Sequence, residues 1–293
     1  MAAVQTNTSG VILPDNLSDI IFQKAQENSI VMQLAQKTTV LPGTTEFQVI
    51  TGDPEASWVS EGAQKPVSTP TFSSKVMTPY KMTTLVVVSN EFESDKSALF
   101  DQLVQRLPNA LAKKFDSTVF GYDTAPGSNF DQLTAATAYD ISTDTYDSLV
   151  DVYSHVTDAQ GVLNGWAVSP KLQATLFKAK DTNNRPLFIQ DLTTQNAIGS
   201  MLGAPIYSNT HAYHAATGDE TVNVLGVAGD WTKSIYGVLD DITIRRSTDA
   251  TITDGTNSYS LFQNNMQAIL AEFRVGFIVE STDYFAKLTT PKA

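Results

Sequence analysis

The sequence contains no cysteine among its 293 residues. Disulfide bonds, thiolate nucleophiles and cysteine-bound zinc are therefore excluded. It also has no apolar stretch close to the ~20 residues that a membrane-spanning helix requires, so no membrane partner is expected. The first residues, MAAVQTNTSGVILPDN, lack both a basic flank and a long apolar run. A secretory signal is not predicted, and we expect synthesis in the cytoplasm.

Positive charge is scarce in this chain. Lys and Arg number 19 against 31 Asp and Glu, which gives a net charge of −12 and a pI near 4.6. The longest basic runs are two pairs, Lys113-Lys114 and Arg245-Arg246. A protein that follows nucleic-acid phosphates needs a basic stripe, so sequence-specific nucleic-acid binding is not expected. Strong acidity suits a protein held at high local concentration, because like charges resist premature association.

Motifs of known catalytic or cofactor-binding chemistry are also missing. The sequence has no GxSxG elbow, GxGxxG turn or Walker loop. The run DTNNRP begins like a calcium loop but has Pro186 where glycine is required. Asp240 and Asp241 are adjacent on a predicted strand and would face opposite sides, which suits no two-carboxylate catalyst. We therefore predict no catalytic, cofactor or metal site, and favour an assembly or binding role over an enzyme.

The three histidines do not change this prediction. His211 and His214 form an HAYH pair that could face a metal from a helix. However, the surrounding stretch is rich in Ala, Thr and Gly and is typical of a loop. We predict that both lie in a surface loop, and that His155 lies on the surface of a helix.

Residues 45–91 predict a long two-stranded ribbon. Residues 45–51 read as a strand that Gly52, Asp53 and Pro54 interrupt. The return limb alternates apolar and polar residues from Phe72 to Val88, which would span about 56 Å as one strand. Pro79 lies inside it and donates no ladder hydrogen bond, so we expect an edge strand or a bent ribbon. Such a ribbon projects from its domain.

The tip of this ribbon, SWVSEGAQKPVSTP, is longer than an ordinary turn. Long irregular loops in ordered proteins are usually functional or disordered. An exposed Trp58 is unfavourable in an isolated subunit, but it would make a good anchor when a partner buries it. We therefore predict inter-subunit contacts at Trp58, Glu61, Lys65 and Pro66.

The remaining elements predict an α+β protein. Residues 1–44 read as an extended tail and one short helix between Leu17 and Leu34. An apolar residue at every fourth position predicts a helix from Ala98 to Gly121, about 36 Å long, which Pro108 should kink or divide. Residues 130–240 alternate helices and strands, with Ser169 and Pro170 beginning a helix that carries Leu172, Leu176 and Phe177 inward. Further predicted elements are a helix near 146–156, strands near 166–168, 206 and 224, two strands around 240–241 and a long strand over 266–281.

The order of these elements resembles that of the Hong Kong 97-type major capsid proteins of tailed bacteriophages. SWVSEGAQKP and FSSKVMTPYKMTTLVVVSNEF look like the family's E-loop, and LFDQLVQRLPNALAKKFDSTVF looks like its spine helix. GDWTKSIYGVLDDITIRRS and FQNNMQAILAEFRVGFIV look like its closing β region. The resemblance implies five parts. They are an N-terminal arm (1–44), an E-loop (45–91), a P-domain spine helix (92–129), an A-domain (130–240) and a P-domain β region (241–293).

The resemblance implies a structural head protein without cofactor or enzyme activity. Pentamers and hexamers would build an icosahedral or prolate shell in the virion, made in the host cytoplasm, around double-stranded DNA contacted non-specifically. The family also implies portal proteins and, in some members, scaffolding or decoration proteins; little room precedes the arm for a built-in scaffolding segment. The alternative is an encapsulin-type nanocompartment shell protein of the same fold. Encapsulins begin with a cargo-binding helix, whereas Met1 to Pro14 read as extended.

Some family members join an E-loop lysine covalently to an asparagine of a neighbour. By resemblance, Lys65, Lys75 and Lys81 are conceivable donors, with Asn264 and Asn265 as acceptors. Glu272 is the candidate proton acceptor. We favour the interpretation that these lysines are ordinary solvated side chains. We therefore expect the arm to bind its neighbour without a covalent bond.

Overall fold

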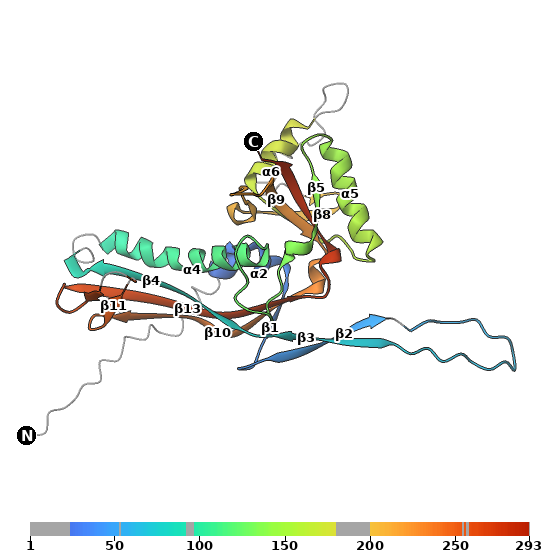
Figure 1. Ribbon diagram of the computed structural model, residues 1–293, viewed down its shortest axis with the longest axis horizontal. Helices are drawn as coiled ribbons and strands as arrows, with labels where there is room; N and C mark the ends of the chain where they lie inside the picture. Colours follow the sequence, from blue (N-terminus) through green and yellow to red (C-terminus); the bar gives the residue numbers. More distant parts are fainter. Residues whose placement is uncertain are drawn as a thin grey trace, which may run out of the picture.

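The computed structural model describes residues 24–52, 54–91, 97–179, 200–253, 255 and 258–292. A long sheet with a helix along it, a second sheet with two helices, and a projecting two-stranded arm make up the molecule (Figure 1). The predicted tail before Lys24, the DTNNRP loop and the side chains of residues 97–105 lie outside the described part.

The first sheet, here the lower sheet, has the strand order β1-β10-β13-β4. β1 is parallel to β10 and the other pairs are antiparallel. The predicted division at Asp240 and Asp241 is wrong, because β10 passes through both residues as one strand with shifts of register there. A bulge of this kind bends a strand without ending its pairing. The strands are β1 (Gln36–Thr39), β4 (Tyr80–Ser89), β10 (Ser234–Ser247) and β13 (Met266–Val279).

The helix α4 (Ser97–Val119) runs along one face of the lower sheet (Figure 1). Every fourth residue along this part of the helix is buried, as the pattern predicts; these residues are Leu107, Leu111, Phe115 and Val119. Pro108 lies inside α4 and does not divide it. A proline removes one intrahelical hydrogen bond, and the buried residues on both sides of Pro108 keep the helix packed on the sheet. The Phe115 ring is central here, since it meets the rings of Phe130, Tyr236 and Phe277 edge-on at 6.3–6.4 Å.

The second sheet, here the upper sheet, has the order β5-β14-β9-β6-β8-β7 and carries α5 and α6 on one face (Figure 1). The Ser169 hydroxyl accepts a hydrogen bond from the Leu172 amide, and Pro170 begins α6, as predicted. Phe177 was expected to point inward but is exposed, while Leu172 and Leu176 are buried. The elements are β5 (Thr137–Asp140), α5 (Thr145–Asp158), β6 (Gly165–Val168), α6 (Pro170–Lys178), β7 (Ser200–Met201), β8 (Ala204–Ser208), β9 (Val222–Gly229) and β14 (Phe285–Pro291).

The last strand joins an unexpected sheet. β14 pairs with β5 and β9 of the upper sheet, although the sequence grouped residues 241–293 with the lower one. Similarly, β10 belongs to the lower sheet from Ser234 onward, before the predicted boundary at residue 240. The chain therefore passes between the lower and the upper sheet more often than the predicted division into consecutive segments allows.

The remaining short elements are α2 (Ile30–Leu34), β11 (Thr251–Thr253), β12 (Ser258–Ser260) and the 3-10 turns η1 (Leu133–Ala135), η2 (Thr210–Ala212), η3 (Trp231–Lys233) and η4 (Thr282–Tyr284).

The arm consists of β2 (Thr45–Gly52), a tip, and β3 (Thr71–Met77). Its strands pair from Thr45 opposite Met77 to Gly52 opposite Thr71. The single strand predicted from Phe72 to Val88 is wrong: β3 ends at Met77 and β4 begins at Tyr80. Pro79 marks the change, because it supplies no amide hydrogen and each strand there takes a different partner.

Candidate assembly interface

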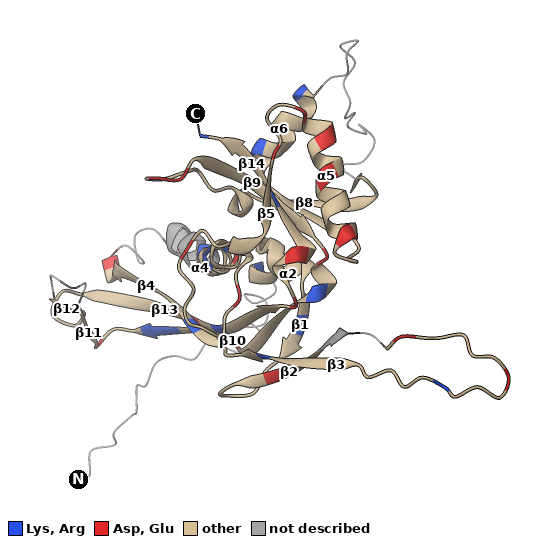
Figure 2. Ribbon diagram, turned by 45° about the vertical axis from the view of Figure 1, so that its right-hand side comes forward, with Lys and Arg blue, Asp and Glu red and all other residues tan. Residues whose placement is uncertain are grey.

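The arm tip projects away from both sheets (Figure 2), and nearly all of its residues are exposed. Trp58 has a relative exposure of 104%, and Val67 one of 91%. Glu61, Lys65 and Pro66 are exposed as well, so the structure places all four predicted contact residues on the free part of the arm. Gly62 has φ +81°, a conformation that lets the chain reverse between the limbs.

An exposed tryptophan on a projecting arm is an unused source of binding energy. Burying a large apolar side chain stabilises a contact by on the order of 3 kcal/mol. A hydrogen bond from the Glu55 amide to the Ser68 hydroxyl (2.7 Å) links the two limbs of the tip. The tip therefore offers an apolar contact that its own subunit does not use.

The root of the arm, in contrast, is firmly packed. Met77 is fully buried, in a cluster with Val40 and Ile278. Gly237 and Gly276 of the lower sheet make room for it, since an added Cβ would lie 2.4 and 2.6 Å from Met77 atoms. The root of the arm is therefore anchored in the lower sheet.

Shortening Met77 to alanine is expected to destabilise this root. Removing a buried methionine side chain costs about 2–5 kcal/mol, because the cavity left behind is only partly refilled. Urea unfolding followed by circular dichroism measures the loss. The matched control is Val67→Ala on the exposed tip, which should change the free energy of unfolding by less than about 0.5 kcal/mol. Equal stability of the two variants would contradict a packed root.

Within one chain, the contacts of Lys75 and Lys81 do not include the candidate asparagines, although Lys81 does meet Glu272. Lys81 pairs with Glu272 at 2.7 Å, and Lys75 pairs with Asp131 at 2.9 Å. The Asn265 side-chain oxygen accepts a hydrogen bond from the side-chain amide of Asn90 at 2.8 Å. Glu272 lies seven residues along the strand from Asn265, roughly 23 Å away at strand spacing.

The environment of Glu272 also suits an ion pair better than a proton acceptor. The hydrogen bond from Lys81 is the main cause that lowers the pKa of Glu272. A general base is most effective with a pKa near the working pH, so this shift weakens Glu272 in that role. Lys65 is exposed at the tip. The expectation that the arm holds its neighbour without a covalent bond stays a prediction.

A buried polar cluster ties α2, α4 and η2 together. The Asp116 carboxylate accepts hydrogen bonds from the Ser29 hydroxyl (2.5 Å), the amides of Ile30 and Val31, and His211 Nδ1 (3.0 Å). The side chain of Asp116 is 0% exposed and that of His211 5%. Burial raises the pKa of Asp116, while the bonds from His211 and Ser29 act against that rise.

The surface-loop prediction for the HAYH pair is therefore wrong for His211. His214 is also in contact with the fold: its ring stacks on Tyr122 at 4.6 Å and its Nε2 lies 3.0 Å from Glu220. His155 is half-buried beside Tyr139. The sequence held one signal for the cluster, because Asp116 lies four residues from both Ala112 and Phe120 on the apolar side of α4.

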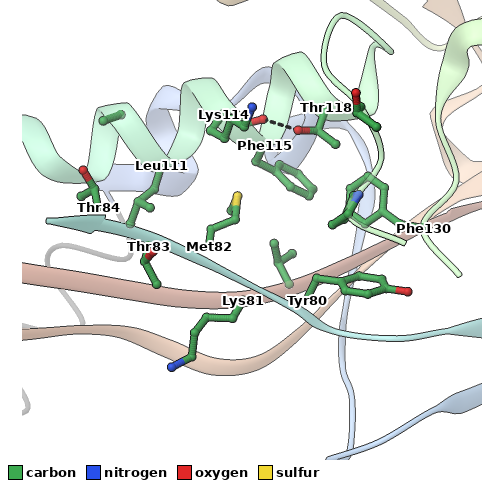
Figure 3. A pocket seen from close by; sticks show the side chains of 14 residues that line it. Tyr80, Lys81, Met82, Thr83, Thr84, Leu111, Lys114, Phe115, Thr118 and Phe130 are labelled. Carbon is green, nitrogen blue, oxygen red and sulfur yellow. Dashed lines mark hydrogen bonds between the residues drawn. The ribbon is translucent and has the colours of Figure 1, made fainter. Parts of the chain in front are cut away.

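A cavity of about 500 Å³ opens between β4 and α4 (Figure 3). Lys81 and Lys114 are its charged lining residues. Lys114, whose side chain is 57% exposed, also pairs with Asp123. β4 is the last strand of the lower sheet in the described part of the chain, so its outer edge is open. The apolar lining includes Tyr80, Met82, Leu111, Phe115, Phe130 and Val275.

Within the described ranges, no group of three His, Asp or Glu side chains is placed to hold a metal ion. No helix of the described chain has both the length and the apolar character needed to cross a membrane. The features with functional potential are thus surfaces: the arm tip, the open edge of β4 and the cavity beside it.

Comparisons with known proteins agree with a surface-based role. The profile of the phage capsid family matches residues 9–290. The probable major capsid protein gp17 of Mycobacterium phage L5 is 28% identical, over 97% of this chain and 90% of its own length. The major capsid protein of Staphylococcus phage 80alpha is 27% identical, over 92% of this chain and 82% of its own. Among solved structures, a chain from Gordonia phage Cozz shares the fold with a TM-score of 0.75 at 23% identity, covering 89% of this chain and 86% of that chain.

Proposed function

Because this chain belongs to the phage capsid family, we propose that its arm is the device by which copies of the protein hold one another in a closed shell. The chain is a structural major capsid protein of the virion, and its relatives do not favour an encapsulin. The observation that carries the proposal is Trp58, fully exposed on an arm whose root is buried.

In this proposal the parts of the molecule take the roles of a Hong Kong 97-type subunit. The arm is the E-loop, the lower sheet with α4 is the P-domain, and the upper sheet with its two helices is the A-domain. Upper sheets gather around the fivefold and sixfold axes of an icosahedral or prolate shell. The shell encloses double-stranded DNA, which the acidic subunit contacts non-specifically, and portal, scaffolding and decoration proteins are the candidate partners.

A projecting arm supports this function for a physical reason. Two strands alone are marginally stable in water, because they bury little apolar surface. Strand edges and apolar tips of this kind are the surfaces that partner chains cover. The repeated partner of a shell protein is another copy of itself, and a head-to-tail contact between copies closes into rings when the rotation allows.

The test is to purify the protein and examine it by sedimentation velocity and electron microscopy. We expect megadalton shells, or pentamers and hexamers that convert to shells. A strictly monomeric protein at high concentration, with no particles on the grid, would contradict the proposal. The content of particles from infected cells distinguishes a phage head from an encapsulin-type nanocompartment. A phage head contains DNA, whereas a nanocompartment contains a packed enzyme.

A further inference from the structure

We infer that the cavity between β4 and α4 is the socket for Trp58 from the arm of a second copy. This inference rests on the proposed function and adds the receiving surface. The occupant is the same chain, since the exposed tip and the cavity have complementary character. The cavity is apolar inside and open to solvent at an unpaired sheet edge.

The size of the cavity suits an aromatic side chain. At about 500 Å³ it lies in the range of pockets that hold small organic ligands, roughly 300–1,000 Å³. Phe115, Phe130 and Tyr80 line it with ring edges and faces (Figure 3), and aromatic side chains pack well against such rings. An indole can therefore enter together with part of its backbone.

One cation beside the cavity is accessible to the acidic tip. Both lysines of the lining pair within the subunit, Lys81 with Glu272 at 2.7 Å and Lys114 with Asp123 at 3.0 Å, but the Lys114 side chain is 57% exposed. The described tip, residues 54–70, carries Glu55 and Glu61 against the single cation Lys65. Glu61 follows Trp58 by three residues, so insertion of the indole brings this carboxylate toward the exposed ammonium of Lys114. Opposite charges across a contact set orientation and speed encounter.

The direction of the arm excludes self-docking. β3 leads from the tip back to Met77, and β4 continues from Tyr80 away from the arm (Figure 1). Tip and cavity therefore lie on opposite sides of the arm's root. The 20 residues from Trp58 to Met77 reach at most roughly 65 Å in the extended state, which is enough to cross to an adjoining subunit. The socket must belong to another copy.

The absence of cysteine makes a disulfide test clean. In a Ser57→Cys and Ala110→Cys double variant, one thiol lies beside Trp58 and the other at the exposed cavity lining on α4. Oxidised particles should give a ladder of linked oligomers on a non-reducing gel, which dithiothreitol collapses to one band. The control pairs Ser57→Cys with Thr157→Cys, an exposed position on α5, and should give no ladder.

A second variant, Ala110→Trp, fills the mouth of the cavity from an exposed helix position and should prevent shell formation while the subunit stays folded. The inference is overturned if shells form normally in Ala110→Trp, or if the 57/110 pair links no better than the control. In either case wild-type shells would still support the proposed function. A wild-type protein that forms no shell would instead reject that function itself.

Discussion

Replacing Trp58 by alanine is expected to abolish shell formation while leaving the subunit folded. The indole is fully exposed in the isolated chain, so its removal costs the subunit almost no packing. In the assembly its burial stabilises each arm contact by on the order of 3 kcal/mol, which corresponds to roughly 100-fold in the strength of that contact. A shell repeats the contact in every subunit, so the lost binding free energy applies to each of these contacts. Sedimentation velocity measures the outcome.

Trp58→Phe is the matched variant, since it keeps an aromatic ring with less buried area. It should retain shells at reduced yield or with higher salt sensitivity. Urea unfolding of both variants should match the wild-type protein within about 0.5 kcal/mol, as is usual for exposed positions. Normal shell yield from Trp58→Ala would show that the tip is not an anchor.

Asp116→Ala has the largest expected effect on the subunit itself. The substitution leaves His211, the Ser29 hydroxyl and the amides of Ile30 and Val31 without their common acceptor in the interior. A buried donor left without its acceptor costs about 1–3 kcal/mol, and this substitution removes the acceptor of several donors at once. We therefore expect the free energy of unfolding to fall by at least this amount, with a lower urea midpoint.

The neighbouring carboxylate Asp123 supplies the control. It pairs with Lys114 at 3.0 Å, but both side chains are more than one-third exposed. Exposed ion pairs contribute about 0–1 kcal/mol, so Asp123→Ala should be nearly as stable as the wild-type protein. If Asp116→Ala were equally stable, the buried cluster would have no structural role.

The pH dependence of Asp116 follows from the same burial. Its pKa is raised above the ordinary value of 3.8, mainly because burial penalises the charged form. The contribution of this group to stability is therefore complete below 3.8 and is lost as the pH rises through the raised pKa. Asp116→Asn cannot ionise and should lose less stability over that window. Parallel urea midpoints of the two proteins across the window would contradict the raised pKa.

Local features of the fold could be predicted from the sequence. The helix around Phe115, the Ser169 cap and the strand from Met266 follow from periodicity and capping, which depend on near neighbours. The break at Pro79 could not be placed, because β3 and β4 each present alternating faces and the alternation continues across the proline. Only the change of partner, from β2 to β13, separates them.

Contacts between residues far apart in the sequence are the part of the fold that the sequence did not predict. Residues 285–291 have a strand pattern that fits either sheet, and their pairing with β5 and β9 depends on residues far away in sequence. Asp116 and His211 are 95 residues apart, and each alone is typical of a solvated surface. The four contact residues at the tip remain a prediction, which was made because a long tip with an exposed tryptophan is unusual in any compact domain.

A cryo-electron microscopy map of the assembled particle tests the central claim most directly, because it traces each arm from its root. We expect residues 54–70 to cross a subunit boundary and the Trp58 side chain to be buried against another copy. A map in which the arm folds back on its own subunit, or projects into solvent with Trp58 exposed, would contradict it.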